Sequence, residues 1–234
     1  MTAAKNQYTL SMIERADDVH VNQWVYQVLR RSIMCGEIRP GIALTIRGLA
    51  EKLAVSPMPV REALHKLASQ AAVEVRDNRR VTVPLISPDK FKELYELRII
   101  LETHAAAKAL AHIGSTELAE LKRLDGMVDR AYADGDVMRG SLANQAFHRY
   151  LYSQNPIQVC LPMIESLWLQ LGPFVRIGLS KLESYYANDR HQEALDAIEK
   201  QDVSRLVQAI ESDIRDGISL IKNVDQLYQD LGGS

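Results

Sequence analysis

The chain has 234 residues, of which 47% are hydrophobic and 25% are charged, and its formal net charge is −2. These proportions are typical of a folded globular protein and exclude a disordered chain, a collagen-like fibre and a membrane protein. The first 20 residues contain no long apolar stretch, so no signal peptide is expected, and two cysteines are too few for a disulfide framework. We therefore expect a cytoplasmic protein that has no membrane partner.

The charge is distributed unevenly along the chain. Residues 20–84 contain ten lysines and arginines against five acidic residues, a local charge of +5, whereas residues 85–234 carry a charge of −6. A basic segment joined to an acidic remainder indicates an anionic partner for the basic segment, and nucleic acid is the first candidate.

The N-terminal third begins with a polar, unpatterned stretch, residues 1–18, which we expect to be a mobile arm. After it, apolar residues recur at helical spacing. The pattern predicts three helices, over residues 21–36, 46–53 and 56–68. At the start of the third helix, Ser56 and Pro57 are typical of an N-cap followed by a proline in the first turn.

A β-hairpin is predicted next. Residues 73–75 and 81–83 alternate between apolar and polar types, and the segment between them is rich in arginine. Asn78 lies at the expected tip, where a residue with positive φ is needed. A helix, a helix–turn–helix and a hairpin in this order predict a winged helix–turn–helix domain over residues 19–84.

The remaining segment, residues 85–230, predicts an all-helical bundle. Ser87 and Pro88 are typical of a helix start, and no convincing strand follows them. Apolar stripes at helical spacing indicate about six or seven helices. We expect the breaks between them to include Gly172-Pro173. The predicted fold class is therefore mainly α, an N-terminal winged helix–turn–helix followed by a helical bundle.

The predicted helix over residues 56–68 is the element best suited to DNA. Its apolar positions account for a buried face, which leaves a charged face and the leading end outside. Arg61 suits a guanine edge or a phosphate, and Arg47 suits a phosphate. The alternative is a solvated charged face on a small helical domain. The candidate DNA-contacting residues are Arg47, Ser56, Pro57, Met58, Arg61, Asn78, Arg79 and Arg80.

Three ordered stretches of the basic segment carry a family resemblance. They are Leu29-x-x-x-Ile33-x-x-Gly36-x-Ile38-x-Pro40-Gly41, Leu49-Ala50-Glu51-x-Leu53-x-Val55-Ser56 and Pro59-Val60-Arg61-Glu62-Ala63-Leu64-x-x-Leu67. Residues 20–84 thereby resemble the winged helix–turn–helix of the GntR family of bacterial transcription regulators. The resemblance implies that Arg47, Ser56, Arg61 and the wing tip contact operator DNA. Many members have Arg-Thr where this chain has Pro57-Met58, so two expected contacts are replaced by apolar groups.

The helical segment carries a second resemblance. Its matching residues are Glu96-Leu97-Arg98-x-x-Leu101-Glu102, Asn144-x-x-x-His148, His191 and Asp202. They resemble the effector domain of the FadR-like branch of the GntR family, called the FCD domain. The resemblance implies a homodimer, a near-palindromic operator and a small molecule in the bundle. In many members a carboxylate effector lies beside a divalent metal, which an Asp-x-x-x-His pair and two later histidines bind.

This chain keeps part of that ligand set. The first position is Asn144 instead of aspartate, His148 and His191 match, and the position of the last histidine falls on Asp213. The resemblance therefore implies a divalent metal, zinc, nickel or manganese, on Asn144, His148, His191 and Asp213. Asn144 and His148 are one helical turn apart and can point into the same space. The alternative is a hydrogen-bonded polar cluster that needs no metal.

Arg98 lies on an otherwise apolar stripe and has two interpretations. It can pair with Glu102 four residues later, or it can bind an effector carboxylate with both ends of its guanidinium group. The expected effector-binding residues are Arg98, Asn144, His148 and His191.

We predict a DNA-binding transcription regulator, a repressor in the preferred interpretation, that is controlled by a small carboxylate and is not an enzyme. The alternative is a helical metalloenzyme that uses His148, His191 and Asp213 and carries the N-terminal domain as a passenger.

Overall fold

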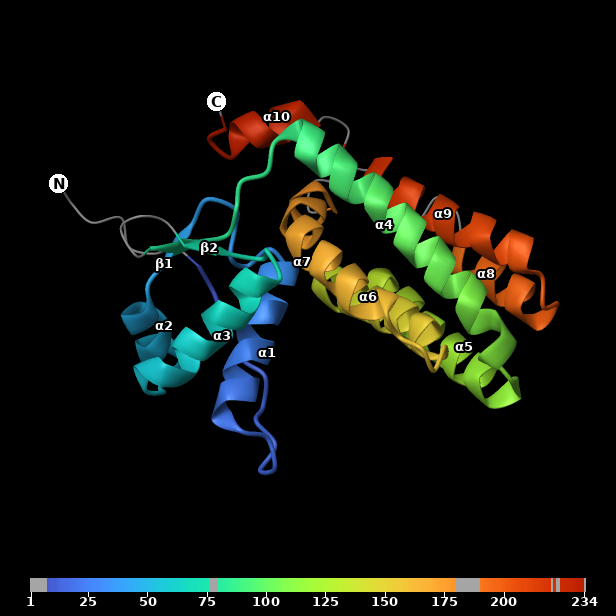
Figure 1. Ribbon diagram of the computed structural model, residues 1–234, viewed down its shortest axis with the longest axis horizontal. Helices are drawn as coiled ribbons and strands as arrows, with labels where there is room; N and C mark the ends of the chain where they lie inside the picture. Colours follow the sequence, from blue (N-terminus) through green and yellow to red (C-terminus); the bar gives the residue numbers. More distant parts are fainter. Residues whose placement is uncertain (1–7, 76–79, 180–189, 220, 222–223, 234) are drawn as a thin grey trace. The chain divides into compact units, whose positions relative to one another are not determined.

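The computed structural model describes residues 8–75, 80–179, 190–219, 221 and 224–233 (Figure 1). These residues form two compact units. The first comprises Met1–Phe91, Trp168–Arg176 and Asn223–Ser234, and the second comprises Lys92–Leu167 and Ile177–Lys222. The mainly α fold class is confirmed, while the domain limits at residues 18 and 84 stay predictions.

The first unit contains the predicted helix–turn–helix. Its helices are α1 (Val21–Met34), α2 (Ile46–Leu53) and α3 (Pro57–Ser69), and α3 packs against both of the others. The apolar faces of the three helices meet in one core. Val25, Leu49 and Val60, one from each helix, are completely buried there. The packing therefore fixes which face of α3 remains in solvent.

A small antiparallel sheet completes this unit. It contains β1 (Ala43–Leu44), β2 (Glu74–Val75) and β3 (Val81–Thr82) in the order β1-β3-β2. Val81 pairs with Val75 on one side and with Leu44 on the other. The β2–β3 hairpin was predicted from the alternating pattern. We did not predict β1, because two residues are too few to show alternation.

Part of the segment expected to be a mobile arm packs against this unit. Tyr8 is buried, and its carbonyl oxygen accepts a hydrogen bond of 2.7 Å from Nζ of Lys52. The Lys52 ammonium also lies 4.2 Å from the centre of the Tyr8 ring. Nε1 of Trp24 donates to the carbonyl oxygen of Ile13 at 2.7 Å. These contacts connect the chain that precedes the helix–turn–helix to α1 and α2.

The helices that follow are long and consecutive. They are α4 (Pro88–Ala109), the 3-10 helix η1 (Leu110–His112), α5 (Ser115–Ala133), α6 (Val137–Ser153), α7 (Cys160–Leu179), α8 (Arg190–Glu199), α9 (Val203–Ser219) and α10 (Val224–Asp230). In the second unit α5 packs against α6, α8 packs against α9, and α5 also contacts α8. None of the helices that the structure describes is long and apolar enough to cross a membrane.

The predicted break at Gly172-Pro173 is wrong, because α7 continues through both residues. The glycine has a different role. A Cβ atom at Gly172 would lie 3.0 Å from the carbonyl oxygen of Met34 in the same unit, so glycine permits a close approach of two backbones. Pro173 lacks an N–H group and removes one helical hydrogen bond, but it is buried, and the packed helix continues past it.

Candidate metal centre and DNA-binding face

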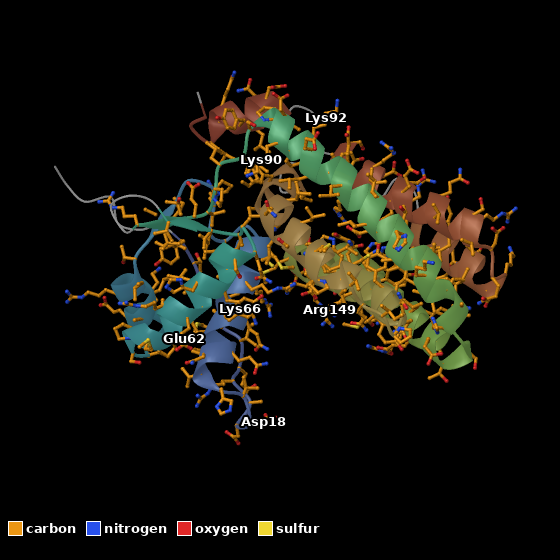
Figure 2. The ribbon with its side chains drawn as sticks, in the orientation of Figure 1. Asp18, Glu62, Lys66, Lys90, Lys92 and Arg149 are labelled. Atoms are coloured by element: carbon orange, nitrogen blue, oxygen red, sulfur yellow. The ribbon has the colours of Figure 1, made fainter. Side chains whose placement is uncertain are left out.

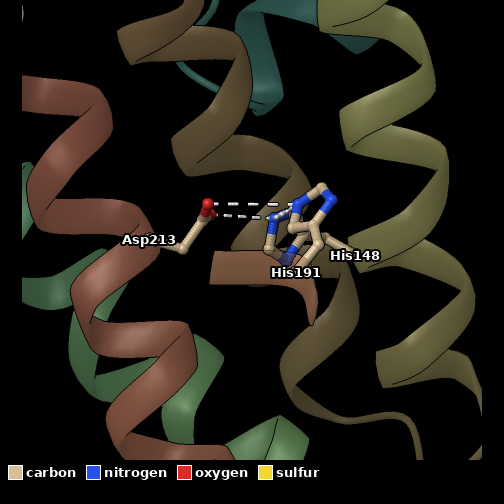
Figure 3. Close-up of side chains that lie close together, drawn as sticks. All are labelled: His148, His191 and Asp213. Atoms are coloured by element: carbon tan, nitrogen blue, oxygen red, sulfur yellow. Dashed lines mark hydrogen bonds and ion pairs between the residues drawn. The ribbon is translucent and has the colours of Figure 1, made fainter. Parts of the chain in front are cut away.

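Three of the predicted metal ligands meet inside the second unit (Figure 3). His148 lies on α6, His191 on the first turn of α8 and Asp213 on α9. Nε2 of His148 lies 3.1 Å from Oδ2 of Asp213 and 3.3 Å from Nε2 of His191. Nε2 of His191 lies 3.9 Å from Oδ1 of Asp213. Both imidazoles are 1% exposed and the Asp213 side chain is 18% exposed, so the three helices place two buried nitrogen ligands beside a carboxylate that is partly accessible.

The other nitrogen of each histidine is held by a second residue. Nδ1 of His191 lies 2.8 Å from Oδ1 of Asp125 on α5, and the carboxylate accepts its proton. Nδ1 of His148 lies 3.1 Å from the hydroxyl oxygen of Tyr152. The single hydroxyl proton of Tyr152 is donated to Glu102 at 2.9 Å, so Nδ1 of His148 is the donor to Tyr152. Both Nδ1 atoms therefore carry protons.

This assignment leaves a lone pair on each Nε2 atom when the imidazoles are neutral. Two nitrogen lone pairs and a carboxylate then face one another with no proton between them, an arrangement that needs a cation. A proton can serve, or a divalent metal. Histidine metal ligands are commonly oriented by an N–H bond to a carboxylate on the far nitrogen, as Asp125 orients His191 here.

The spacing of the three acceptor atoms also fits a metal ion. A tetrahedral zinc ion with bonds of about 2.0–2.1 Å holds its ligand atoms roughly 3.3–3.4 Å apart. The two Nε2 atoms are 3.3 Å apart, and one ligand atom each from His148, His191 and Asp213 lies within 4.8 Å of the other two. The donor set is thus compatible with a small divalent cation that imidazole and carboxylate bind.

Asp213 is held in its ionised form. Burial by itself raises the pKa of this carboxyl. When a proton serves as the cation of the cluster, the hydrogen bond from His148 and the charges of His148, His191 and Arg98 outweigh that effect and lower the pKa to about 2. The cluster consequently keeps one anionic oxygen ligand throughout the physiological pH range.

A buried chain of polar contacts extends from the histidines to α4. Tyr152 connects His148 to Glu102, which is fully buried and also accepts a charge-assisted bond from Nε of Arg98. Burial and the Glu102 carboxylate raise the pKa of the Tyr152 hydroxyl well above its usual value, so the hydroxyl stays protonated. Of the two interpretations of Arg98, the structure shows the pair with Glu102. The guanidinium has further N–H groups beyond the one that bonds Glu102.

Asn144, the fourth predicted ligand, lies one turn before His148 on α6 and is half-buried. Its side chain makes no hydrogen bond to any residue within the described ranges. The structure therefore brings together His148, His191 and Asp213, and the participation of Asn144 stays a prediction.

Sequence reasoning did not identify two residues of the site. Asp125 is a buried acid on a helix face that otherwise buries Leu121, Leu124 and Val128. A carboxylate on an apolar stripe was the available signal, since such a group needs a buried partner. Tyr152 follows His148 by four residues and so lies on the same face of α6, but a tyrosine at that spacing is common in helical cores.

The predicted DNA-binding face surrounds the N-terminus of α3. Ser56 occupies the N-cap position, and its side chain makes no capping hydrogen bond. Pro59 occupies the third helical position and has no N–H, so it cannot donate one of the two backbone bonds that an N-cap side chain commonly accepts. By contrast, the Thr45 side chain caps α2 by accepting from the backbone N–H of Gly48 at 3.1 Å. The Ser56 hydroxyl is exposed and available to an external partner.

The other candidates on this face are also exposed. Arg47 on α2, Arg61 on α3 and Arg80 before β3 lie in solvent, as does Pro57 at the start of α3. Met58 is 61% exposed, which is unusual for a methionine and leaves its side chain able to contact an apolar group such as a thymine methyl. Asn78 and Arg79 lie outside the described residues.

Glu62 and Lys66 extend from the solvent side of α3 and are labelled in Figure 2. Both already have partners. Asn22 at the start of α1 donates to the Glu62 carboxylate, and the Lys66 ammonium lies 4.1 Å from the centre of the Tyr26 ring. These contacts tie α3 to α1 and help to set the orientation of the exposed face.

Comparison with protein families matches both parts of the chain. Residues 22–83 match the gntR family of bacterial regulatory proteins, and residues 93–216 match the FCD domain. The second match alone covers more than half of the chain.

Named relatives are also regulators. The HTH-type transcriptional regulator McbR of Escherichia coli is 33% identical over 145 residues, which cover 62% of this chain and 66% of McbR. The gluconate operon transcriptional repressor of Bacillus subtilis is 24% identical over 80% of this chain and 79% of its own length. The solved structure of E. coli McbR/YncC superposes with a TM-score of 0.78 at 27% identity, and the match covers 91% of this chain and 99% of that one.

Proposed function

Because this chain belongs to the GntR family of bacterial transcription regulators, in the branch that carries an FCD domain, we propose that it is a repressor controlled by a small carboxylate and a divalent metal. The families and relatives that it matches are transcription regulators and not enzymes, which removes the metalloenzyme alternative. Repression rather than activation of transcription is supported by the gluconate operon transcriptional repressor among its relatives.

One observation supports the metal above all others. The two Nδ1 protons are committed to Asp125 and Tyr152, so in the neutral imidazoles the Nε2 atoms of His148 and His191 turn lone pairs toward the Asp213 carboxylate. A bound divalent metal would offer a Lewis-acidic centre to which a carboxylate effector can bind. Imidazole and carboxylate ligands suit zinc and nickel, and manganese is the third candidate.

Effector binding is proposed beside the same cluster. Arg98 lies near enough to Asp213 for the two charges to influence each other, and it is paired with Glu102 of the buried network. Its remaining N–H groups can bind one end of a carboxylate. Asn144 and the two histidines complete the set of proposed effector contacts.

DNA binding is proposed for the first unit. The exposed N-terminus of α3, with Ser56, Met58 and Arg61, would read base edges in the major groove. Arg47, Arg80 and the wing tip with Asn78 and Arg79 would contact phosphates, and these contacts would make the affinity depend on salt. Two copies of the chain would bind the two halves of a near-palindromic operator. The effector then changes DNA affinity only to the extent that it binds one placement of the two DNA-binding domains more tightly than the other.

Elemental analysis tests the metal directly. The full chain is purified without a metal-affinity tag or chelator, and the expected result is about one divalent metal per chain. The matched variants are His148→Ala with His191→Ala, which should lose the metal, and His112→Ala, an exposed histidine that should keep it. A chain that contains no metal after soaking in zinc, nickel and manganese contradicts the metal site.

The effector is tested separately. Small hydroxycarboxylates, with gluconate among them, are added to the metal-loaded protein bound to operator DNA selected from random sequences. Release of the DNA by one of them, and a weaker response in Arg98→Ala, is the expected result. A response of equal size in Arg98→Ala would remove this residue from the effector site.

A further inference from the structure

The second unit exposes an unusual group of large apolar side chains. Leu97 and Ile100 on α4 are 44% and 62% exposed. Ile157, Val159 and Met163, at the start of α7 and just before it, are 71%, 64% and 53% exposed. Among the described residues of this unit, Val203 is the one other large apolar side chain exposed to this degree. Clustered exposed apolar side chains generally mark an interaction surface.

A groove lies between α4 and the segment before α7. Its volume is about 280 Å³, and its lining includes His104 and Lys108 from α4 together with Ile157 and Val159. His104 lies one turn after Ile100 on the same side of α4, so the groove borders the exposed stripe of that helix. We call the stripe together with residues 157–163 the α4 face.

The stripe on α4 consists of Glu93, Leu97, Ile100, His104 and Lys108, all of them exposed. With 3.6 residues per turn, these five positions fall within an arc of about 80° around the helix axis. Buried residues such as Glu102 and Ala109 lie on the other side of the helix, where they face the unit's own interior. The stripe therefore points away from the bundle.

The charges on this stripe are arranged symmetrically about its middle. The symmetry point lies midway between Ile100 and Leu101. Glu93 before this point and Lys108 after it are equally far from it along the sequence, and so are Leu97 and His104. If two copies of α4 lie antiparallel with a two-fold axis at this midpoint, Glu93 of each copy faces Lys108 of the other. An interface between identical chains with two-fold symmetry must be complementary to itself, and this stripe meets that condition.

We propose that the α4 face is the surface through which two copies of this chain associate, with their α4 helices antiparallel. In this register Leu97 of each copy approaches His104 of the other, at the edge of the groove that Ile157 and Val159 line. The apolar side chains now in solvent would then be covered by their counterparts. The inference rests on the homodimer of the proposed function and adds the surface, the orientation and the ion pairs.

Charge reversal tests the arrangement. Glu93→Lys places two like-charged pairs across the axis, and Lys108→Glu does the same with the opposite sign. Each variant by itself should weaken the dimer, with a dissociation constant at least about tenfold higher, because like charges face each other at both ends of the interface. In an equal mixture of the two variants, each lysine again faces a glutamate, so the heterodimer should form with nearly wild-type affinity. Sedimentation velocity of the full-length proteins, over a range of concentrations, measures all three.

Lys92→Glu is the matched control. Lys92, which is labelled in Figure 2, is also on the first turns of α4, and its side chain is 76% exposed. With 3.6 residues per turn, it lies about 120° around the helix from the centre of the stripe. Its reversal should leave the dimer unchanged. Ile100→Asp, at the axis itself, should dissociate the dimer, and thermal melting confirms that each variant is folded.

The possible results separate the two levels of the proposal. A wild-type chain that stays monomeric at every concentration overturns the homodimer and the interface together. A wild-type dimer that the charge reversals leave unchanged, or variants that do not prefer each other in the mixture, would overturn the α4 face while the dimer and the regulator function stand. Weakening by Lys92→Glu to the same degree would also overturn it, since a general charge effect would then explain the loss.

Discussion

Replacing Asp125 by asparagine tests the metal centre through a residue that is not itself a metal ligand. Asp125 accepts the Nδ1 proton of His191 at 2.8 Å, and the bond fixes which nitrogen of the ring faces the cluster. Asparagine has nearly the same shape but no charge. The imidazole then loses the carboxylate that makes it a stronger base and holds its orientation. We expect Asp125→Asn to fold and to bind metal more weakly.

The size of the effect follows from linkage. Loss of such an outer partner typically weakens metal binding about 10- to 100-fold. At free zinc 100 times the dissociation constant of the wild-type site, bound metal stabilises the fold by about 2.7 kcal/mol, and the same zinc stabilises the variant by about 1.4 or 0.4 kcal/mol. A loss of about 1.3–2.3 kcal/mol corresponds to roughly 3–9 °C less of a metal-induced rise in Tm for a chain of this length.

The assay compares thermal melting of wild type and variant with chelator and with buffered zinc. The quantity of interest is the difference between the two conditions, because the substitution can also change the stability of the metal-free protein. Asp129→Asn is the control, since Asp129 lies one turn further along α5 and is exposed. An unchanged zinc-induced rise in Asp125→Asn, or an equal loss in Asp129→Asn, would refute the role assigned to Asp125.

Three further predictions follow from the same structure. Thr45→Ala should lower the unfolding free energy by roughly 0.5–2 kcal/mol because it removes a helix cap. Ser56→Ala should leave the melting temperature unchanged and weaken DNA binding, because the Ser56 side chain caps nothing. Equal melting temperatures of the two variants would contradict this difference. Arg61→Ala should reduce affinity for selected operator DNA by about 1–3 kcal/mol and leave non-specific binding much less affected; a filter-binding titration in fixed salt measures both. In metal-free protein, Asp213 has a pKa lowered from 3.8 to about 2, so its ionised form stabilises the fold above about pH 4, and this stabilisation is lost as the pH falls through about 2. Asp213→Asn should therefore make the unfolding free energy less steep over that acid range, and urea titrations from pH 5 to pH 2 would show it.

The sequence predicted the helices well where the apolar period was regular. The limits of α2 match the prediction, and α3 differs from it by one residue at each end, because apolar spacing and proline placement determine both. The continuous α7 shows the weakness of local signals. Gly172 and Pro173 indicate a break when considered alone, but the close approach of the Met34 backbone depends on chain more than a hundred residues away.

Only the three proposed metal ligands of the candidate site could be predicted from the sequence. His148, His191 and Asp213 came from a resemblance, and the structure brings them together. Their partners Asp125 and Tyr152 come from other turns and helices, and no spacing in the sequence relates Asp125 to His191. Hydrogen-bond geometry in three dimensions is what assigns the protons, and this assignment is what separates a cluster that needs a cation from an ordinary polar core.

Helix α4 belongs to both proposals, and this shared element has a physical consequence. Its inner side contains Arg98 and Glu102, which Tyr152 connects to His148, while its outer side contains Leu97 and Ile100. Leu97 and Arg98 are adjacent residues of one helix, so a ligand that draws Arg98 away from Glu102 by rotating or shifting α4 must also move Leu97. If two copies pair through that outer side, such a movement changes their relative orientation and with it the spacing of the two DNA-binding domains. Coupling of this kind is reciprocal: a ligand that favours one dimer arrangement must itself bind more tightly when operator DNA holds that arrangement.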